Sequence, residues 1–410
     1  MEMTPGYKQT DAGVIPDDWD VKQLGELSSV SAGGTPSRSN ANYWGGDIPW
    51  ITTTEIDFRL ITESEQFITS IGLKNSAAKL MPAGALLMAL YGQGKTRGKV
   101  GVLGFEAATN QACAAIILKK GYSREYAFHY LASQYDEIRK LSNTGNQENL
   151  NGALVRSIPV LLPPLSEQSA IATALSDVDA LLSSLDALII KKRDIKQAAM
   201  QQLLTGKTRL PGFEGEWEVR KVGEFTDCTA GGTPSTLMDD FWGGDIRWMN
   251  SGELNFRRVH EVEGRITEAG LINSSTKLIP PGCVLIGLAG QGRTRGTVAM
   301  NYVELCTNQS IAAIFPNPSF STEYLYQNLD SRYEELRGLS SGGGGRGGLN
   351  LTLIKGLDIP FPSIAEQTAI AEVLCDMDGE LAALEARRDK TRLLKQGMMQ
   401  ELMTGKTRLV

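Results

Sequence analysis

The segment GQGKTRGKV, residues 92–100, places a lysine and a threonine between glycines, as a phosphate-binding turn does. It follows the apolar run ALLMALY, which is typical of a strand. ATPases hold a triphosphate with the pattern G-x-x-x-x-G-K-[ST], so the first hypothesis is a nucleotide site. The leading position of that pattern is Ala89 rather than glycine, so the motif is incomplete.

A second glycine loop, GQGRTRGTV at residues 290–298, has the opposite defect. Gly287 stands at the leading position, but Arg293 occupies the place of the lysine. The tetrapeptide TGKT at residues 205–208 and 404–407 also lacks the first glycine in both places. Because no copy of the motif is complete, we do not expect this chain to bind ATP.

Both glycine loops share the order Gly-Gln-Gly-basic-Thr-Arg-Gly. Glutamine and arginine read the edges of adenine and guanine, whereas lysine, threonine and backbone N–H groups contact phosphates. Flanking glycines let a backbone approach a groove closely. We therefore predict DNA-facing loops, with a purely structural hairpin as the alternative. The candidate residues are Gln93, Lys95, Thr96, Arg97, Gln291, Arg293, Thr294 and Arg295.

Other polar stretches offer further candidates for contact with DNA. AGGTPS at residues 32–37 and 230–235 is typical of a turn that presents hydroxyls to phosphate, or of a turn that only connects strands. The stretches at residues 143–151 and 340–350 would either order on DNA or form surface loops. We expect the tryptophans in the core rather than stacked on bases. The candidate residues are Thr35, Ser37, Asn146, Gln147, Thr233, Ser235 and Arg346.

The chain is an internal tandem repeat. WGGDI at residues 44–48 returns at 242–246, which is 198 positions later, and AGGTPS, TNQ and all six tryptophans pair at the same spacing. Towards the end the spacing is 199 positions, as for TGKTRL at residues 205–210 and 404–409. No cysteine pairs with a cysteine and neither histidine pairs with a histidine, so a chemistry that both copies share cannot depend on these residues.

Each copy combines a mixed domain with a long helix. GALLMALY and CAAIILKK are typical of strands, and residues 123–141 are typical of one amphipathic helix. A helical stretch with few glycines and prolines follows. We therefore expect an α+β fold with homologous domains at residues 1–163 and 207–362, and spacer helices at 164–206 and 363–410.

The two spacer helices are expected to pair with each other. Apolar residues of the first helix repeat every three or four positions, as in a coiled coil, at Ile171, Leu175, Val178, Leu182, Leu185 and Ile189. Both helices begin acidic and turn basic, at Lys191 in the first and at Arg387 in the second. Antiparallel pairing sets acid against base, so we predict an intramolecular antiparallel coiled coil that separates two domains with pseudo-twofold symmetry. An oligomerisation stalk formed with another chain is the alternative.

Composition limits the classes of function. The chain has 410 residues, of which 41% are hydrophobic and 21% charged, as in a soluble protein of more than one domain. No apolar run reaches the roughly 18 residues of a membrane helix, and the N-terminus lacks a signal-peptide pattern, so we expect a cytoplasmic protein. Five scattered cysteines and two histidines suggest neither disulfides nor a metal site. The net charge of −6 argues against nucleic-acid binding through the overall field.

In combination, these motifs resemble the specificity subunit of Type I restriction–modification systems. The resemblance rests on GGTPS, on YWGGDIPWI with FWGGDIRWM, on the glycine loops, on TNQ, and above all on IPVLLPPLSEQSAIA with IPFPSIAEQTAIA. It implies that each α+β domain is a target-recognition domain that reads one half of a bipartite double-stranded DNA site. It also implies that the helices set the half-site spacing and dock two methylation subunits.

The resemblance further implies that the chain itself is not an enzyme and holds no cofactor. The methylation subunits would bring S-adenosylmethionine, and restriction subunits would add ATP and Mg²⁺. In agreement, no G-x-G-x-x-G cofactor fingerprint follows a predicted strand and opens a helix; the pattern occurs only within the glycine run of the polar stretch at residues 340–350. Because the two domains are so alike and the symmetry would invert one of them on the duplex, we expect a nearly palindromic split target.

Overall fold

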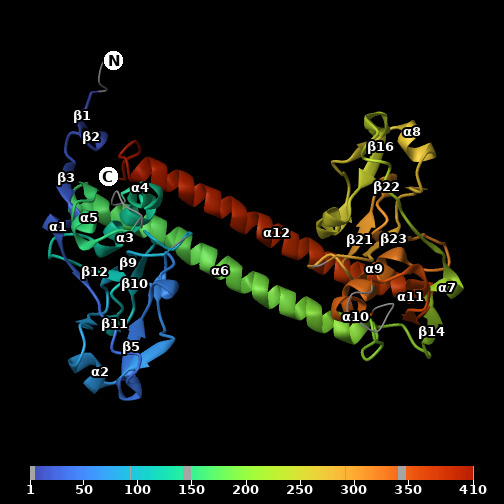
Figure 1. The fold of residues 1–410 in the computed structure, drawn as a ribbon, viewed down its shortest axis with the longest axis horizontal. Helices are drawn as coiled ribbons and strands as arrows, with labels where there is room; N and C mark the ends of the chain where they lie inside the picture. Colours follow the sequence, from blue (N-terminus) through green and yellow to red (C-terminus); the bar gives the residue numbers. More distant parts are fainter. Residues whose placement is uncertain (1–4, 93, 142–148, 291, 340–347, 410) are drawn as a thin grey trace. The chain divides into compact units, whose positions relative to one another are not determined.

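The computed structural model describes residues 5–92, 94–141, 149–290, 292–339 and 348–409. Backbone contacts divide the chain into two units (Figure 1), Met1–Asp186 with Ala386–Val410, and Ala187–Glu385. The division cuts both long helices, so each unit contains one α+β domain and a part of each helix. The α+β class and the duplication expected from the sequence are both confirmed.

The first unit is built around a five-stranded sheet. Its strand order is β4-β12-β9-β10-β6, with the bounds Ser28–Ala32, Cys113–Leu118, Leu86–Ala89, Val100–Leu103 and Leu60–Ile61. Neighbouring strands are antiparallel except β10 and β6, which are parallel. The predicted strands GALLMALY and CAAIILKK form β9 and β12, because continuous apolar runs suit strands that are buried on both faces.

Two apolar cores cover the two faces of this sheet, since successive side chains of a strand point in opposite directions. Leu86 and Met88 of β9 pack in one core with the helices α3 (Arg124–Ser133) and α5 (Gly152–Arg156). Leu87 packs in the other core with Ile51 of a second sheet. That four-stranded sheet has the order β7-β5-β11-β8, with the bounds Gln66–Ile68, Trp44–Ile51, Ala107–Thr109 and Leu80–Met81.

The single helix predicted over residues 123–141 is wrong. The structure has two helices there, α3 and α4 (Tyr135–Lys140). The chain leaves helical geometry at Gln134, and the hydroxyl of Ser133 donates to the carbonyl of Tyr130 at 2.7 Å. A side chain that bonds back to the preceding turn competes with helix continuation, which explains the break.

The second unit repeats the five-stranded and the four-stranded sheets of the first. Its five-stranded sheet has the order β15-β23-β20-β21-β17, with the bounds Cys228–Ala230, Ile311–Ile314, Val284–Gly287, Val298–Asn301 and Arg258–Val259. Its four-stranded sheet has the order β18-β16-β22-β19, with the bounds Arg265–Ile266, Trp242–Met249, Leu305–Thr307 and Leu278–Ile279. The helices equivalent to α3, α4 and α5 are α9 (Thr322–Asp330), α10 (Tyr333–Gly338) and α11 (Leu351–Lys355).

Short elements complete both units. Two-stranded sheets pair β1 (Tyr7–Thr10) with β2 (Gly13–Pro16), β3 (Asp20–Gln23) with β13 (Pro159–Leu162), and β14 (Glu218–Lys221) with β24 (Asp358–Phe361). Short α-helices are α1 (Leu24–Leu27), α2 (Ser70–Lys74), α7 (Val222–Phe225) and α8 (Glu268–Ile272). Turns of 3-10 helix are η1 (Ala41–Tyr43), η2 (Thr53–Glu55), η3 (Asp239–Phe241) and η4 (Ser251–Phe256).

The long helices α6 (Leu165–Leu203) and α12 (Ile364–Leu402) run antiparallel within each unit. In the first unit, Asp179 of α6 pairs with Lys395 at 2.6 Å and Asp186 pairs with Arg392 at 3.4 Å. Residue numbers therefore rise along α6 as they fall along α12, which is the antiparallel arrangement. In the second unit the acid lies on α12, where Glu380 accepts from Lys192 at 2.6 Å. The predicted pairing of acid with base is therefore confirmed. None of the helices in the described part of the chain has the length and apolarity that crossing a bilayer requires.

The repeated TGKTRL motif follows the last turn of each long helix, and its arginine binds a glutamate at the start of the other long helix. In the first unit, the Arg408 guanidinium donates to both carboxylate oxygens of Glu167, at 2.7 and 2.8 Å, and the indole of Trp19 donates to the same carboxylate at 3.1 Å. In the second unit, Arg209 and Trp217 hold Glu366 in the same way. This places the red end of α12 against the N-terminal strands in Figure 1, and it gives the arginine of TGKTRL a structural role.

Candidate nucleic-acid interface

The AGGTPS turns lie against the TNQ segments, and glycine is required for this contact. A Cβ atom on Gly231 would lie 1.9 Å from the carbonyl oxygen of Thr307, and the equivalent Gly33 has the same restriction. Just beyond these glycines, the hydroxyl of Thr233 donates to Oε1 of Gln309 at 2.6 Å. The candidate Thr35 makes the corresponding bond to the glutamine of the first TNQ. The two repeated motifs therefore form one structural feature.

Two tryptophans support this turn, of which Trp50 is buried in the core as expected and Trp44 is half-buried. The Trp50 indole donates to the carbonyl of Gly34 at 2.9 Å, and the Trp44 indole donates to the carbonyl of Ser37 at 3.1 Å. The two rings meet edge to face with centroids 5.0 Å apart. The second unit repeats both bonds and the ring contact, with Ser235 in the place of Ser37. The side chains of both candidate serines remain exposed.

Each glycine loop connects two antiparallel strands, β9 with β10 in the first unit and β20 with β21 in the second. In the first loop, Ala89 donates to the carbonyl of Lys99 and Gly98 donates to the carbonyl of Ala89, both at 2.9 Å. Gly92 and Gly94 have φ values of +135° and +81°, which side chains other than glycine rarely adopt. Because a strand follows the loop where a phosphate-binding loop would start a helix, this geometry is not that of an ATPase loop.

The side chains of the glycine loop differ in their exposure. Lys95 is exposed, as is Arg293 at the same position of the second loop, whereas Thr96 and Thr294 are half-buried. Arg97 turns inward, so that its side chain is buried and its guanidinium donates to the carbonyl of Arg139 at 3.1 Å. Arg97 therefore supports the loop from inside in this structure. Its counterpart Arg295 is half-buried.

A tyrosine and an arginine under each loop were missed by the sequence analysis. The Tyr135 hydroxyl donates to the carbonyl of Lys95, and Arg139 donates to the Tyr135 hydroxyl at 2.8 Å. In the second unit, the Tyr333 hydroxyl donates to the carbonyl of Arg293 at 3.2 Å. Arg337 donates to Tyr333 at 2.7 Å in turn. These residues also pair at the spacing of the repeat, so an extended comparison of the two copies would have found them.

The candidate turns and loops meet at one end of the strands of the five-stranded sheet. β4 and β9 both run antiparallel to β12, so the ends of β4 and β9 lie beside the start of β12. Ala32 pairs with Ala114, and Ala89 pairs with Cys113. This brings the AGGTPS turn, the TNQ segment and the glycine loop together, and we call it the loop edge. β15, β20 and β23 form the same edge in the second unit.

Five candidates, Gln93, Asn146, Gln147, Gln291 and Arg346, lie outside the described residues. The chain next to them joins the loop edge, because the amide of Leu150 donates to the carbonyl of Leu90 at 3.0 Å, and that of Leu349 to the carbonyl of Leu288 at 2.9 Å. Arg38 was missed by the sequence analysis. It is exposed beside Ser37, and its guanidinium carbon lies 3.8 Å from the centroid of Trp44.

The thiols of the sheets are not suited to reaction. Cys113 and Cys283 are completely buried in apolar cores. Burial raises the pKa of Cys113 far above its ordinary value and that of Cys283 to about 12. Both thiols therefore stay protonated at neutral pH, and the thiolate is the reactive form of cysteine. The loop edge offers an exposed cation, hydroxyls and backbone groups, which are suited to contact with phosphates.

These features define a class of protein with a duplicated α+β domain, a long helix after each copy and the same loop edge in both. The chain belongs to the Type I restriction modification DNA specificity domain family, which matches residues 16–192 and 214–393.

Relatives and solved structures agree with this assignment. The type I restriction enzyme MjaIX specificity subunit of Methanocaldococcus jannaschii is 32% identical over 186 residues, which are 43% of this chain and 42% of that protein. The putative MjaX specificity subunit of the same organism is 23% identical, over 98% of this chain and 97% of the relative. The S subunit of a type I system from M. genitalium has a similar fold, with a TM-score of 0.63, 14% identity and coverage of 98% of this chain and 99% of that one.

Proposed function

We propose that this chain is the DNA-specificity subunit of a Type I restriction–modification complex, and that each α+β domain reads one half of a bipartite target. The observation that carries the proposal is the duplication of the loop edge, with an exposed cation on each glycine loop. Lysine and arginine beside hydroxyls and backbone amides suit contact with phosphates and base edges. Two such edges in one chain suit a target in two parts.

The exposed residues of the loop edge are assigned to DNA and the buried ones to support. Lys95 and Arg293 are the principal cations, and Ser37 and Ser235 are the exposed hydroxyls. The other described candidates at the edge are Thr35, Thr96, Thr233 and Thr294. Gln93, Gln291, Asn146, Gln147 and Arg346 are further proposed contacts, although they lie outside the described residues. Arg97 holds the loop in place, so its contribution to DNA binding is indirect.

The partners follow from the family. One similar structure, with a TM-score of 0.60 and 18% identity over 96% of this chain and 99% of that one, comes from work on complex assembly of the type I system. Two methylation subunits would bind along the long helices and bring S-adenosylmethionine, and restriction subunits would bring ATP and Mg²⁺. This chain would supply recognition without catalysis, inside the cytoplasm.

The two half-sites are expected to be similar and inverted, which makes the target nearly palindromic. The two units share their strand order, their loop edges and the supporting tyrosine and arginine. Modules built so alike suit similar bases. Differences between the copies, such as Lys95 in one loop and Arg293 in the other, leave room for half-sites that are not identical.

The proposal is tested by replacing the exposed cations in the chain assembled with its methylation subunits. Lys95→Ala and Arg293→Ala should each lower DNA affinity by about tenfold and reduce the salt dependence of binding by about one ion. Lys120→Ala is the matched control, because this exposed lysine follows the other end of β12. Unchanged affinity in both loop variants, or an equal loss in the control, would contradict the proposal.

A further inference from the structure

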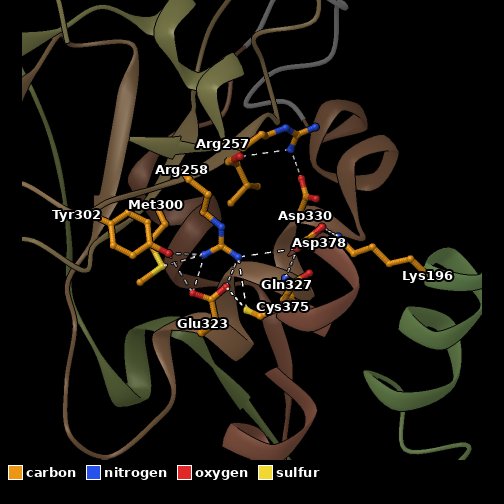
Figure 2. Close-up of polar contacts among 11 residues, drawn as sticks. Lys196, Arg257, Arg258, Met300, Tyr302, Glu323, Gln327, Asp330, Cys375 and Asp378 are labelled. Atoms are coloured by element: carbon orange, nitrogen blue, oxygen red, sulfur yellow. Dashed lines mark hydrogen bonds and ion pairs between the residues drawn. The ribbon is translucent and has the colours of Figure 1, made fainter. Parts of the chain in front are cut away.

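In the second unit, Arg258 of β17 fills a polar site between the domain and α12 (Figure 2). Its guanidinium donates to Glu323 of α9 at 2.6 Å and to the Tyr302 hydroxyl at 2.7 Å. It also lies 3.9 Å from a carboxylate oxygen of Asp378 on α12, and its carbon lies 4.3 Å from the centroid of the Tyr326 ring. Two carboxylates, a hydroxyl and an aromatic face thus surround one guanidinium, an arrangement suited to arginine.

The first unit keeps most of this site but lacks the arginine. By the repeat, the counterparts of Arg258, Tyr302, Glu323, Tyr326, Cys375 and Asp378 are Leu60, Gly104, Glu125, Phe128, Ser176 and Asp179. Both carboxylates and the aromatic ring are therefore retained. The two large polar side chains that fill the space in the second unit are replaced by a leucine and a glycine.

The missing side chains leave an open groove of about 550 Å³ in the first unit, which we call the Leu60 groove. Its lining includes Leu60, Glu125, Phe128, His129, Ser176 and Asp179. These are the counterparts of Arg258 itself and of five residues around it. The groove therefore corresponds to the Arg258 site with Leu60 in place of the arginine, and it is also lined by Arg59 and Arg124, of which Arg124 pairs with Glu125.

The polar groups of the Leu60 groove are only partly used. In the second unit, one oxygen of Asp378 accepts from Gln327 at 2.9 Å and faces Arg258. In the first unit, the corresponding oxygen of Asp179 lies 3.9 Å from Nδ1 of His129. This nitrogen is buried, and among the described residues it has no hydrogen-bond partner. A hydrogen-bond donor placed between Glu125 and Asp179 would face Oδ2 of Asp179. The corresponding oxygen of Asp378 faces the Arg258 guanidinium in the second unit.

Two carboxylates, Glu125 and Asp179, and two arginines, Arg59 and Arg124, line the groove, so its net charge does not exclude a cation. Burial, with a smaller contribution from Lys395, lowers the pKa of His129 to about 4, so His129 is neutral at pH 7. Glu125 is paired with Arg124 and Asp179 with Lys395, as Asp378 is paired with Lys196. In the second unit, Lys196 pairs with Asp378 and yet does not prevent the approach of Arg258. Lys395, the counterpart of Lys196, should therefore not prevent the approach of a guanidinium to Asp179 in the first unit.

We infer that the Leu60 groove binds a guanidinium group from outside the chain, held between Glu125 and Asp179 with Phe128 against its face. The occupant would join the first domain to α6, as Arg258 joins the second domain to α12. Both a free guanidinium compound and an arginine side chain of a partner protein carry this group. The inference rests on contacts within the chain and not on the proposed function.

The test uses the full chain and agmatine, which carries a guanidinium on a four-carbon chain. Agmatine at millimolar concentration should bind in a saturable way by calorimetric titration and raise the unfolding temperature. Putrescine, with an ammonium in place of the guanidinium, should bind at least about tenfold more weakly, because it lacks the planar fork. No saturable binding to the wild-type chain, or equal binding of putrescine, would overturn the inference.

Variants place the binding in the groove. Leu60→Arg places an arginine at the position of Arg258 and should abolish agmatine binding. Asp179→Asn should weaken binding by about tenfold and leaves the shape of the groove intact. In the opposite direction, Arg258→Leu with Tyr302→Gly should lower the unfolding temperature and create a second site, so agmatine should restore part of the loss. Agmatine binding that both first-unit variants retain would contradict the assignment.

The two sources of the guanidinium are distinguished by assembly with the methylation subunits. If an arginine of a subunit is the occupant, the Leu60→Arg variant and millimolar agmatine should both reduce co-purification of that subunit. If a free compound is the occupant, assembly should be unaffected by the variant. Either result supports the site, and the titration of the chain alone decides whether the site exists, even if the proposed function fails.

Discussion

Replacing Arg408 by methionine should destabilise the first unit far more than the loss of a surface ion pair. The Glu167 side chain is completely buried, and Arg408 donates to both of its oxygens at 2.7 and 2.8 Å. Methionine keeps much of the arginine's apolar packing but leaves the carboxylate buried with the Trp19 indole as its remaining side-chain donor, at 3.1 Å. The variant therefore isolates the loss of the charge partner.

The expected cost is about 3 kcal/mol of unfolding free energy. Removing one partner of a buried ion pair costs roughly 3–5 kcal/mol, because the other charge stays buried without compensation. The lower end applies because the bond from Trp19 remains and because the Arg408 side chain is 27% exposed. Neutralising the carboxylate as well, in Glu167→Gln with Arg408→Met, should recover about 1–3 kcal/mol.

Urea unfolding at pH 7, followed by tryptophan fluorescence, measures these differences as shifts of the midpoint at constant slope. Lys140→Met is the control, because its ion pair with Glu137 is exposed on both sides and its loss should leave the midpoint unchanged. An Arg408→Met midpoint equal to that of the control would refute the reasoning. A double variant less stable than Arg408→Met would refute the explanation through a buried uncompensated charge.

Three further outcomes follow from the structure. Gly231→Ala should lower unfolding free energy by at least about 2 kcal/mol, since its Cβ would lie 1.9 Å from a backbone oxygen, whereas Gly379→Ala, in open space on α12, should cost nothing; equal melting temperatures would contradict this. His129→Gln should reduce acid sensitivity. Folded His129 has a pKa of about 4, whereas histidine in the unfolded chain has a pKa near 6.5. As the pH falls from 6.5 to 4, only the unfolded wild type takes up this proton, so the wild type loses up to about 3 kcal/mol of unfolding free energy that the variant keeps. Parallel stability–pH curves would disprove this. Tyr333→Phe should raise the KM of the assembled methylase for DNA by about fivefold at unchanged kcat, because it frees the Arg293 carbonyl; an unchanged KM would count against a positioning role.

The architecture was predictable because its signals are local or repeated. The acidic start and basic end of each long helix were enough to predict antiparallel pairing, and ion pairs such as Asp179 with Lys395 confirm it. Continuous apolar runs predicted β9 and β12 because strands buried on both faces need no alternation. The glycine-rich loop was predicted as a turn, and Gly92, Gly94 and Gly98 adopt positive φ values there.

The rest depends on contacts between residues distant in sequence. Arg97 and Lys95 lie two positions apart in a basic loop, yet Arg97 turns inward because the end of α4, about forty residues later, offers it a carbonyl. TGKTRL was rejected as a nucleotide loop because the first glycine is missing, but only the fold shows that its arginine binds Glu167 or Glu366. The break at Gln134 depends on a side-chain bond that periodicity does not reveal.

The central claim is that two similar modules in one chain each read one half of a split DNA target. Genome-wide mapping of methylated bases, in cells that express this chain with its methylation subunits, tests it most directly. The account predicts a single motif made of two similar half-sites in inverted orientation, separated by a gap of fixed length. A continuous motif, a gap of variable length or two unrelated half-sites would contradict it.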